Sequence, residues 1–153
     1  MQVIKDKTVY RELWYRFYAE FGFEREAEQW VKPALPHKMF KLRKLWTEEQ
    51  ERTVCEIFCR LCSGEMFALD WQHDCFIFSP EEHIPLYYQY YDLKQDCTVY
   101  FPSFFPNGDF HFFLSADWQL GLFGHPWRAE ICVMGTALTA EFEMLKDQLD
   151  LAE

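Results

Sequence analysis

The sequence has no long run of apolar residues. None of its stretches approaches the roughly 18 consecutive apolar residues that can span a bilayer, and the opening MQVIKDKTVYRE lacks the apolar block of a signal peptide. We therefore expect a cytoplasmic protein that has no membrane partner. Because thiols stay reduced in that compartment, we do not expect the six cysteines to form disulfides.

Recognisable catalytic motifs are also missing. The chain has no G-x-S-x-G nucleophile elbow, no glycine-rich loop that could hold a phosphate and no dinucleotide-binding fingerprint. These absences favour a protein without catalysis, and we expect no cofactor.

Basic side chains are scarce after residue 63. Residues 64–153 contain 15 acidic and three basic side chains, a net charge of −12, whereas residues 1–63 contain 10 acidic and 12 basic ones, a net charge of +2. A negative field repels phosphate and attracts cationic proteins, so we expect a basic protein partner and no nucleic acid. The acid excess could also serve only to keep an aromatic-rich chain soluble.

What the chain does have is enough apolar material for a core. Half of its 153 residues are apolar and a fifth are aromatic, a composition far from that of disordered chains. The length fits one domain of ordinary size. We expect a single domain over residues 1–153.

Three segments have the apolar spacing of amphipathic helices. Apolar residues recur in steps of three and four over 8–21, where Gly22 is a suitable C-cap, and over 136–153. A third helix is predicted from Thr47 to residue 62, because Thr47 and Gln50 have the spacing of a capping box.

From Met66 onward the pattern changes to alternation with period two. Six short runs between turn signals predict strands at 66–71, 75–80, 97–102, 109–115, 119–123 and 129–135. The fold class we expect is α+β, with an antiparallel meander of about five or six strands packed with N-terminal and C-terminal amphipathic helices. Residues 81–95 are ambiguous between a helix and a strand with a loop. The proline- and lysine-containing segment 31–44 is expected to be an extended surface connector that faces the acidic half.

Cys55, Cys59 and Cys62 have the C-x-x-x-C-x-x-C spacing of one class of iron–sulfur enzymes. On a helix, Cys55 and Cys62 are roughly 10 Å apart along the axis. Two thiolates on one zinc ion must approach to about 4 Å. We therefore interpret these cysteines, together with the strand residues Cys75, Cys97 and Cys132, as buried apolar side chains.

Three turns contain most of the polar and aromatic residues that could form a site: DWQH at 70–73, ADW at 116–118 and GHPW at 124–127. Their candidate binding residues are Asp70, Trp71, His73, Asp117, Trp118, His125 and Trp127. Rigid turns, with an unusual backbone angle at Gly124, would also explain these strings. His73, His111 and His125 could meet at a metal, but no H-x-x-x-H or similar spacing supports one, so no metal is expected.

Tyrosines are concentrated between residues 87 and 100. Tyr87, Tyr88, Tyr90 and Tyr91 follow one another closely in an acidic region, with Tyr100 nearby. Tyrosine provides contact area with a polar tip at low entropy cost, so these residues are candidates for a protein-binding surface. A half-buried position in the core is the alternative.

Two strings, ALDWQHDCFIF at 68–78 and FPNGDFHFFLSADWQLGLFGHPWRAEICVMG at 105–135, resemble the bacterial domain-of-unknown-function family 2716. They cover about a quarter of the chain. The resemblance implies a small bacterial cytosolic protein. No activity is established for that family, so it assigns no catalytic residue.

Two functions remain as the main expectations. The first is a non-catalytic protein-binding module, in its most concrete form an immunity-type protein that neutralises a basic toxin through an acidic, aromatic surface. The second is a small-ligand-binding protein or enzyme whose single pocket is formed by the DWQH, ADW and GHPW turns. That pocket requires Asp70, His73, Asp117 and His125 to converge within hydrogen-bonding reach. A structural subunit of a larger assembly is a third possibility.

Overall fold

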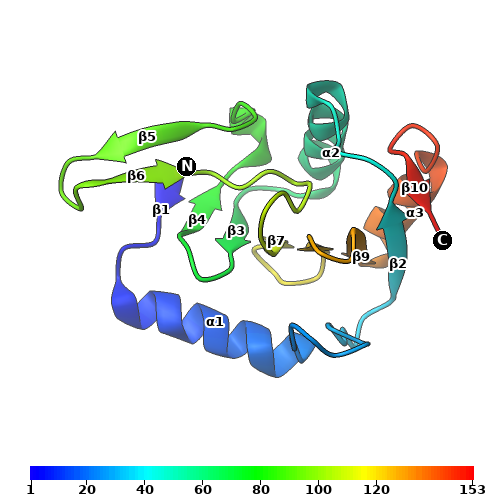
Figure 1. The fold of residues 1–153 in the computed structure, drawn as a ribbon, viewed down its shortest axis with the longest axis horizontal. Helices are drawn as coiled ribbons and strands as arrows, with labels where there is room; N and C mark the ends of the chain where they lie inside the picture. The colour runs from blue at the N-terminus through cyan, green and yellow to red at the C-terminus, as the bar shows by residue number, and fades with distance from the viewer.

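The computed structural model describes residues 1–153 and has three α-helices and ten strands (Figure 1). The helices are α1 (Lys7–Phe21), α2 (Glu48–Leu61) and α3 (Thr136–Met144), with a 3₁₀ helix, η1, at Pro80–Glu82. The strands are β1 (Gln2–Val3), β2 (His37–Leu42), β3 (Met66–Asp70), β4 (Cys75–Phe78), β5 (Gln89–Asp92), β6 (Cys97–Tyr100), β7 (His111–Ser115), β8 (Gly121–His125), β9 (Glu130–Met134) and β10 (Leu151–Ala152).

Eight strands form one antiparallel sheet in the order β1-β4-β3-β7-β8-β9-β2-β10. The α+β class and the antiparallel sheet are confirmed, but the expected number of five or six strands is wrong. Strands β1 and β10 have two residues each, too few to show any alternation. Strand β6 was expected in the meander and instead pairs with β5 in a separate two-stranded sheet.

The segment 31–44 is not a surface connector, because its residues 37–42 form β2 inside the sheet. β2 lies between β9 and β10, with Met39 opposite Cys132. Its lysines do face acidic residues of the second half: Lys38 forms an ion pair with Glu143, and Lys41 Nζ lies 2.5 Å from a carboxylate oxygen of Glu130.

Helices cover both faces of the sheet, so the sheet is buried on two sides. Figure 1 shows α1 on one side of the strands and α2 and α3 on the other. Phe112 and Leu114 of β7 pack in the cluster that contains Phe17 of α1, whereas Phe113 packs in the cluster that contains Phe58 of α2. This alternation follows the pleat of the strand.

The helix ends follow the expected capping chemistry. Gly22 ends α1 with φ of 56°, and the Thr47 hydroxyl accepts from the backbone N–H of Gln50 at 3.2 Å in a complete capping box. α3 is shorter than expected, because the chain turns back after Met144 to place Leu151 opposite Leu42 of β2. None of these helices is both long and apolar enough to cross a membrane.

Strands β5 and β6 form a hairpin that extends away from the helices (Figure 1). Tyr90 lies opposite Val99 in its register, and Val99 is buried in the core while most of the other hairpin side chains are exposed or half-buried. The hairpin is therefore anchored at two buried positions, Val99 in the core and Asp92, which pairs with Lys5, and is otherwise open.

The cysteines are all free thiols in the structure, but they are not all buried. Cys75 and Cys132 are core residues as expected. Cys97 is exposed on β6, so its assignment to the core is wrong, because β6 belongs to the open hairpin. The three cysteines of α2 and its C-cap are half-buried.

Candidate functional site

The three polar turns do not surround one pocket. Asp70 lies opposite His111 in the β3–β7 pairing, and His111 lies opposite Gly124 in the β7–β8 pairing, so the DWQH and GHPW turns share one end of the sheet. Asp117 follows Ser115 at the other end of β7. The expected convergence of Asp70, His73, Asp117 and His125 is therefore wrong, because β7 separates Asp117 from the others.

The ADW turn is explained by its own contacts. The Asp117 carboxylate accepts from the Ser115 hydroxyl at 2.6 Å and from the Gln119 backbone N–H at 3.2 Å, and the Ser115 bond lowers the pKa of Asp117. Trp118 is buried, stacks on Phe21 and lies under the guanidinium of Arg16. Asp117 therefore closes the turn, and Trp118 holds it against α1.

The GHPW turn places one residue inside the protein and one outside. His125 is buried, its Nε2 lies 3.3 Å from the backbone oxygen of Arg25, its Nδ1 accepts from the Arg128 N–H, and burial lowers its pKa. Trp127 is 63% exposed and packs edge-on against Phe110. His125 is thus a bonded structural residue, and Trp127 is the accessible one.

Two carboxyl groups and two imidazoles meet at the shared end of the sheet. His73 Nδ1 lies 3.3 Å from Asp70 Oδ1 and 3.5 Å from Asp109 Oδ2, and His111 Nε2 lies 3.8 Å from Asp70 Oδ1. His111 Nδ1 contacts the Ser103 carbonyl oxygen at 2.8 Å. Trp71, next to Asp70, donates its indole N–H to the Tyr18 hydroxyl.

The surroundings of Asp70 make its ionised form less favourable than that of an ordinary aspartate. Asp70 Oδ1 is buried without a hydrogen-bond partner, and burial raises the pKa of Asp70 to about 6. When His111 donates its Nδ1 proton to the Ser103 carbonyl oxygen, its unprotonated Nε2 faces Asp70. Two acceptor atoms then face each other, and protonation of Asp70 relieves this contact. The sequence does not reveal Asp109 as a site residue, because only the pairing of β7 with β3 brings it close to His73.

Exposed apolar area is concentrated on the β5–β6 hairpin. Eleven large apolar side chains are exposed in the protein, and five of them lie between residues 87 and 100: Tyr87, Tyr88, Tyr91, Leu93 and Tyr100. Tyr90 is half-buried against the core. The structure therefore places most of the predicted tyrosines on an accessible surface. We call residues 87–100, which comprise the β5–β6 hairpin and the two tyrosines before it, the tyrosine hairpin.

Acidic residues surround the tyrosine hairpin. Asp92 accepts from Lys5 Nζ at 2.7 Å, and Asp96 accepts from the Tyr91 hydroxyl. Desolvation, together with the charge of Asp92, raises the pKa of Asp74, whereas the charge of His73 opposes this shift. Glu81 lies on η1 just before the hairpin.

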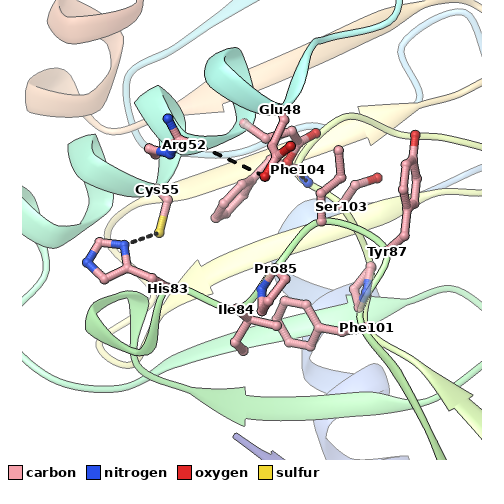
Figure 2. Close-up of a pocket in the computed structure, with 13 residues that line it drawn as sticks. Glu48, Arg52, Cys55, His83, Ile84, Pro85, Tyr87, Phe101, Ser103 and Phe104 are labelled. Atoms are coloured by element: carbon pink, nitrogen blue, oxygen red, sulfur yellow. Dashed lines mark hydrogen bonds and ion pairs between the residues drawn. The ribbon is translucent and has the colours of Figure 1, made fainter.

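A cavity of about 420 Å³ opens at the base of the tyrosine hairpin. Figure 2 shows its two walls: Glu48, Arg52 and Cys55 of α2 on one side, and residues of 83–87 and 101–104 on the other. The walls are tied together by Glu51, whose carboxylate accepts from the backbone N–H groups of Phe104 and Phe105 at 2.9 and 2.8 Å. Burial raises the pKa of Glu51 to about 7, although these two bonds oppose the shift.

A cysteine and a histidine meet at the edge of this cavity without forming a nucleophilic pair. Cys55 Sγ and His83 Nδ1 are 4.0 Å apart (Figure 2), but the Cys55 thiol donates to the Pro80 carbonyl oxygen at 3.2 Å. Burial raises the pKa of Cys55 to about 12. A thiol that stays protonated is a poor nucleophile, so this pair does not indicate covalent catalysis.

Taken together, these features define an α+β protein with a sheet covered on both faces and an exposed, tyrosine-rich hairpin. The chain belongs to the family described as "Protein of unknown function (DUF2716)", whose model matches residues 5–139. The resemblance inferred from the two strings is confirmed.

A curated relative is the uncharacterized protein YxiI of Bacillus subtilis (strain 168). The two sequences are 41% identical over 73 residues, which is 48% of this chain and 40% of the relative. The match therefore spans less than half of that relative's length. No solved structure matches the chain.

Proposed function

We propose that this protein is a non-catalytic binding module whose tyrosine hairpin contacts another protein. The observation that carries the proposal is the concentration of exposed Tyr87, Tyr88, Tyr91 and Tyr100 on one hairpin. Tyrosine is enriched in the centres of protein interfaces, because it buries a large ring and keeps a polar tip for hydrogen bonding.

The partner we propose is a basic protein. Seven of the 15 acidic residues after position 63 are paired with cations from the first 63 residues: Glu82, which pairs with the N-terminal amino group, and Asp92, Glu130, Glu141, Glu143, Asp150 and Glu153. Asp74, Glu81 and Asp96 have no such ion pair and lie near the tyrosine hairpin. Complementary positive charge on a partner would be attracted to this side of the molecule.

The most specific form of the proposal is an immunity-type protein. In that form, the tyrosine hairpin covers the active surface of a cationic toxin, and the neighbouring cavity accepts one of its side chains. Glu48, Glu51 and Arg52 line this cavity, and Arg52 lies 3.9 Å from Glu48, so the excess of one acidic side chain suits a cationic group.

The experiment is a pull-down from lysate of the native organism with three versions of the tagged protein. These are the unmodified chain, a Tyr88→Ser/Tyr91→Ser variant, and a Tyr15→Ser control, which changes an 80% exposed tyrosine on α1. We expect the unmodified chain and the control to retain the same basic protein at low salt, identified by mass spectrometry, and the hairpin variant to lose it.

Retention of nothing by the unmodified chain, or equal retention by all three versions, would contradict the proposal. Recovery of an acidic protein would contradict the proposed partner chemistry while leaving the hairpin as the contact surface. Both variants change exposed positions, so their folding is checked by comparing thermal unfolding with that of the unmodified chain.

A further inference from the structure

The half-buried face of α2 brings two thiols beside an imidazole. Cys55 and Cys59 are four residues apart, about one helical turn, and so lie on the same face. His83, which follows η1, comes to this face from outside the helix. The ligand atoms of the three residues all lie within 4.8 Å of one another, and Cys55 Sγ and His83 Nδ1 are 4.0 Å apart.

The backbone places His83 here in an uncommon conformation. His83 is the C-cap of η1 and has φ of 46°, in the left-handed region that residues other than glycine seldom occupy. Ser79 holds η1 from the other end, since its hydroxyl accepts from the Glu81 N–H and its own N–H donates to Glu82. The imidazole is therefore carried by a short, capped segment next to α2.

Two cysteines and one histidine are a ligand set that zinc prefers. In a tetrahedral zinc site, with bonds of about 2.3 Å to sulfur and about 2.0 Å to nitrogen, ligand atoms are on the order of 3.6–3.8 Å apart. The separations in this cluster exceed those values by about 1 Å or less, a gap that side-chain rotation covers. We propose that Cys55, Cys59 and His83 form a Zn²⁺ site.

The fourth coordination position would face the cavity at the base of the tyrosine hairpin. Cys55 and His83 both line that cavity, and Figure 2 shows them at one end of it. With three protein ligands, the zinc ion completes its coordination with a water molecule or a group of a bound partner, as in sites that keep an open position. This inference does not depend on the proposed protein partner.

The surrounding charges suit a dication. Glu56 is a negative neighbour of both thiols, Glu51 of Cys55 and Glu81 of Cys59, and these three carboxylates outnumber the one positive neighbour, Arg60, beside Cys59. Zinc binding releases the protons of both thiols, breaks the bond from Cys55 to the Pro80 carbonyl, and forms two Zn–S bonds and one Zn–N bond. No oxidant or reductant takes part.

The test uses Co²⁺ as a spectroscopic probe on the full chain, purified with reductant and then freed of metal and reductant under anaerobic conditions. We expect one equivalent of Co²⁺ to produce thiolate-to-cobalt charge-transfer absorption and the visible bands of a tetrahedral site, and Zn²⁺ to displace it. Zn²⁺ should also raise the thermal unfolding midpoint, because a ligand that binds only the folded state stabilises it.

Three variants and one control separate this site from other thiols. Cys55→Ser, Cys59→Ser and His83→Ala should each reduce the charge-transfer intensity or abolish it, whereas Cys97→Ser, which changes the exposed cysteine of β6, should leave the spectrum unchanged. His83 is exposed, so His83→Ala should fold even if a cysteine variant does not. Absence of a charge-transfer band, or a band that survives both Cys59→Ser and His83→Ala, would overturn the proposal.

Discussion

Gly124 has no side chain, and this allows two segments to pack closely at one end of the sheet. The sequence suggested an unusual backbone angle, but Gly124 is not among the glycines with positive φ. Instead, a Cβ atom at this position would lie 2.5 Å from Pro106 Cβ, so the glycine permits a close approach between β8 and the loop before β7.

We predict that Gly124→Ala destabilises the protein by about 1–3 kcal/mol, the usual cost of overpacking a tight site. Urea denaturation of the two proteins would measure the difference. In a double-mutant cycle, Pro106→Gly removes the opposing Cβ, so Gly124→Ala should cost less in that background. The same cost in both backgrounds would show that Pro106 is not the cause.

Asp70 gives a residue-level prediction for pH. Its folded pKa of about 6 is above the roughly 3.9 of an unfolded aspartate, so Asp70 stays protonated up to a higher pH in the folded state. The free energy of unfolding should therefore fall as pH rises from about 4 to about 6. We predict that Asp70→Asn removes this part of the pH dependence and is more stable than the unmodified chain near pH 7, by on the order of 1–3 kcal/mol.

Urea denaturation at several pH values would measure both curves, with exposed Asp147→Asn as the control. His73, Asp109 and His111 lie beside Asp70, so the comparison rests on the difference between the curves. Parallel curves for Asp70→Asn and the unmodified chain would contradict the raised pKa.

At the scale of elements, Glu51 connects α2 to the segment before β7. Its carboxylate accepts the backbone N–H groups of Phe104 and Phe105, and both would lose their partner in Glu51→Ala. We predict a loss of about 2–4 kcal/mol, because an unsatisfied buried donor costs about 1–3 kcal/mol. Thermal or urea unfolding would measure it.

A control from the same helical turn is Glu49→Ala, which removes an exposed carboxylate and should cost at most about 1 kcal/mol through the helix dipole. Glu51→Gln should fall between the two, since an amide oxygen can accept but its nitrogen cannot. Equal effects of Glu51→Ala and Glu49→Ala would mean that the two backbone bonds contribute little.

The elements with strong local signals were predictable from the sequence, and those that depend on distant pairing were not. Thr47 and Gln50 specified the start of α2, and Gly22 the end of α1. β2 was missed because its lysines suggested a solvated segment, although Phe40 and Leu42 alternate with Lys41 as a half-buried strand requires.

The candidate sites show the same division. The tyrosine hairpin was visible as composition, because its residues are neighbours in sequence. The cluster of Cys55, Cys59 and His83 was not, since the cysteines were judged by the separation of the outer pair and His83 lies in a segment of ambiguous structure. Asp109 and His111 met Asp70 only through the β3–β7 register.

At the scale of the whole molecule, charge is divided between the two halves of the chain. Lysines of β2 and its surroundings neutralise part of the acidic half, and the acids that remain include those near the tyrosine hairpin. The electrostatic field that a partner meets therefore depends on which acidic residues have no ion pair, in addition to the net charge of −10.

We predict that the association rate constant with a basic partner decreases as ionic strength rises, because salt screens the long-range attraction. Stopped-flow measurements with the partner recovered by pull-down would show this, and the dissociation rate constant should change much less. An association rate constant that is the same at low and high salt would contradict electrostatic steering.

The attachment of the tyrosine hairpin has a consequence for how such a protein can diversify. Its two strands pair only with each other, and its main fixed point in the core is Val99. Changes at its exposed positions therefore alter no strand pairing of the eight-stranded sheet. If the tyrosine hairpin binds a partner as proposed, relatives with one scaffold would recognise different targets through hairpins that vary in sequence and length, while the scaffold remains under the constraint of its packing.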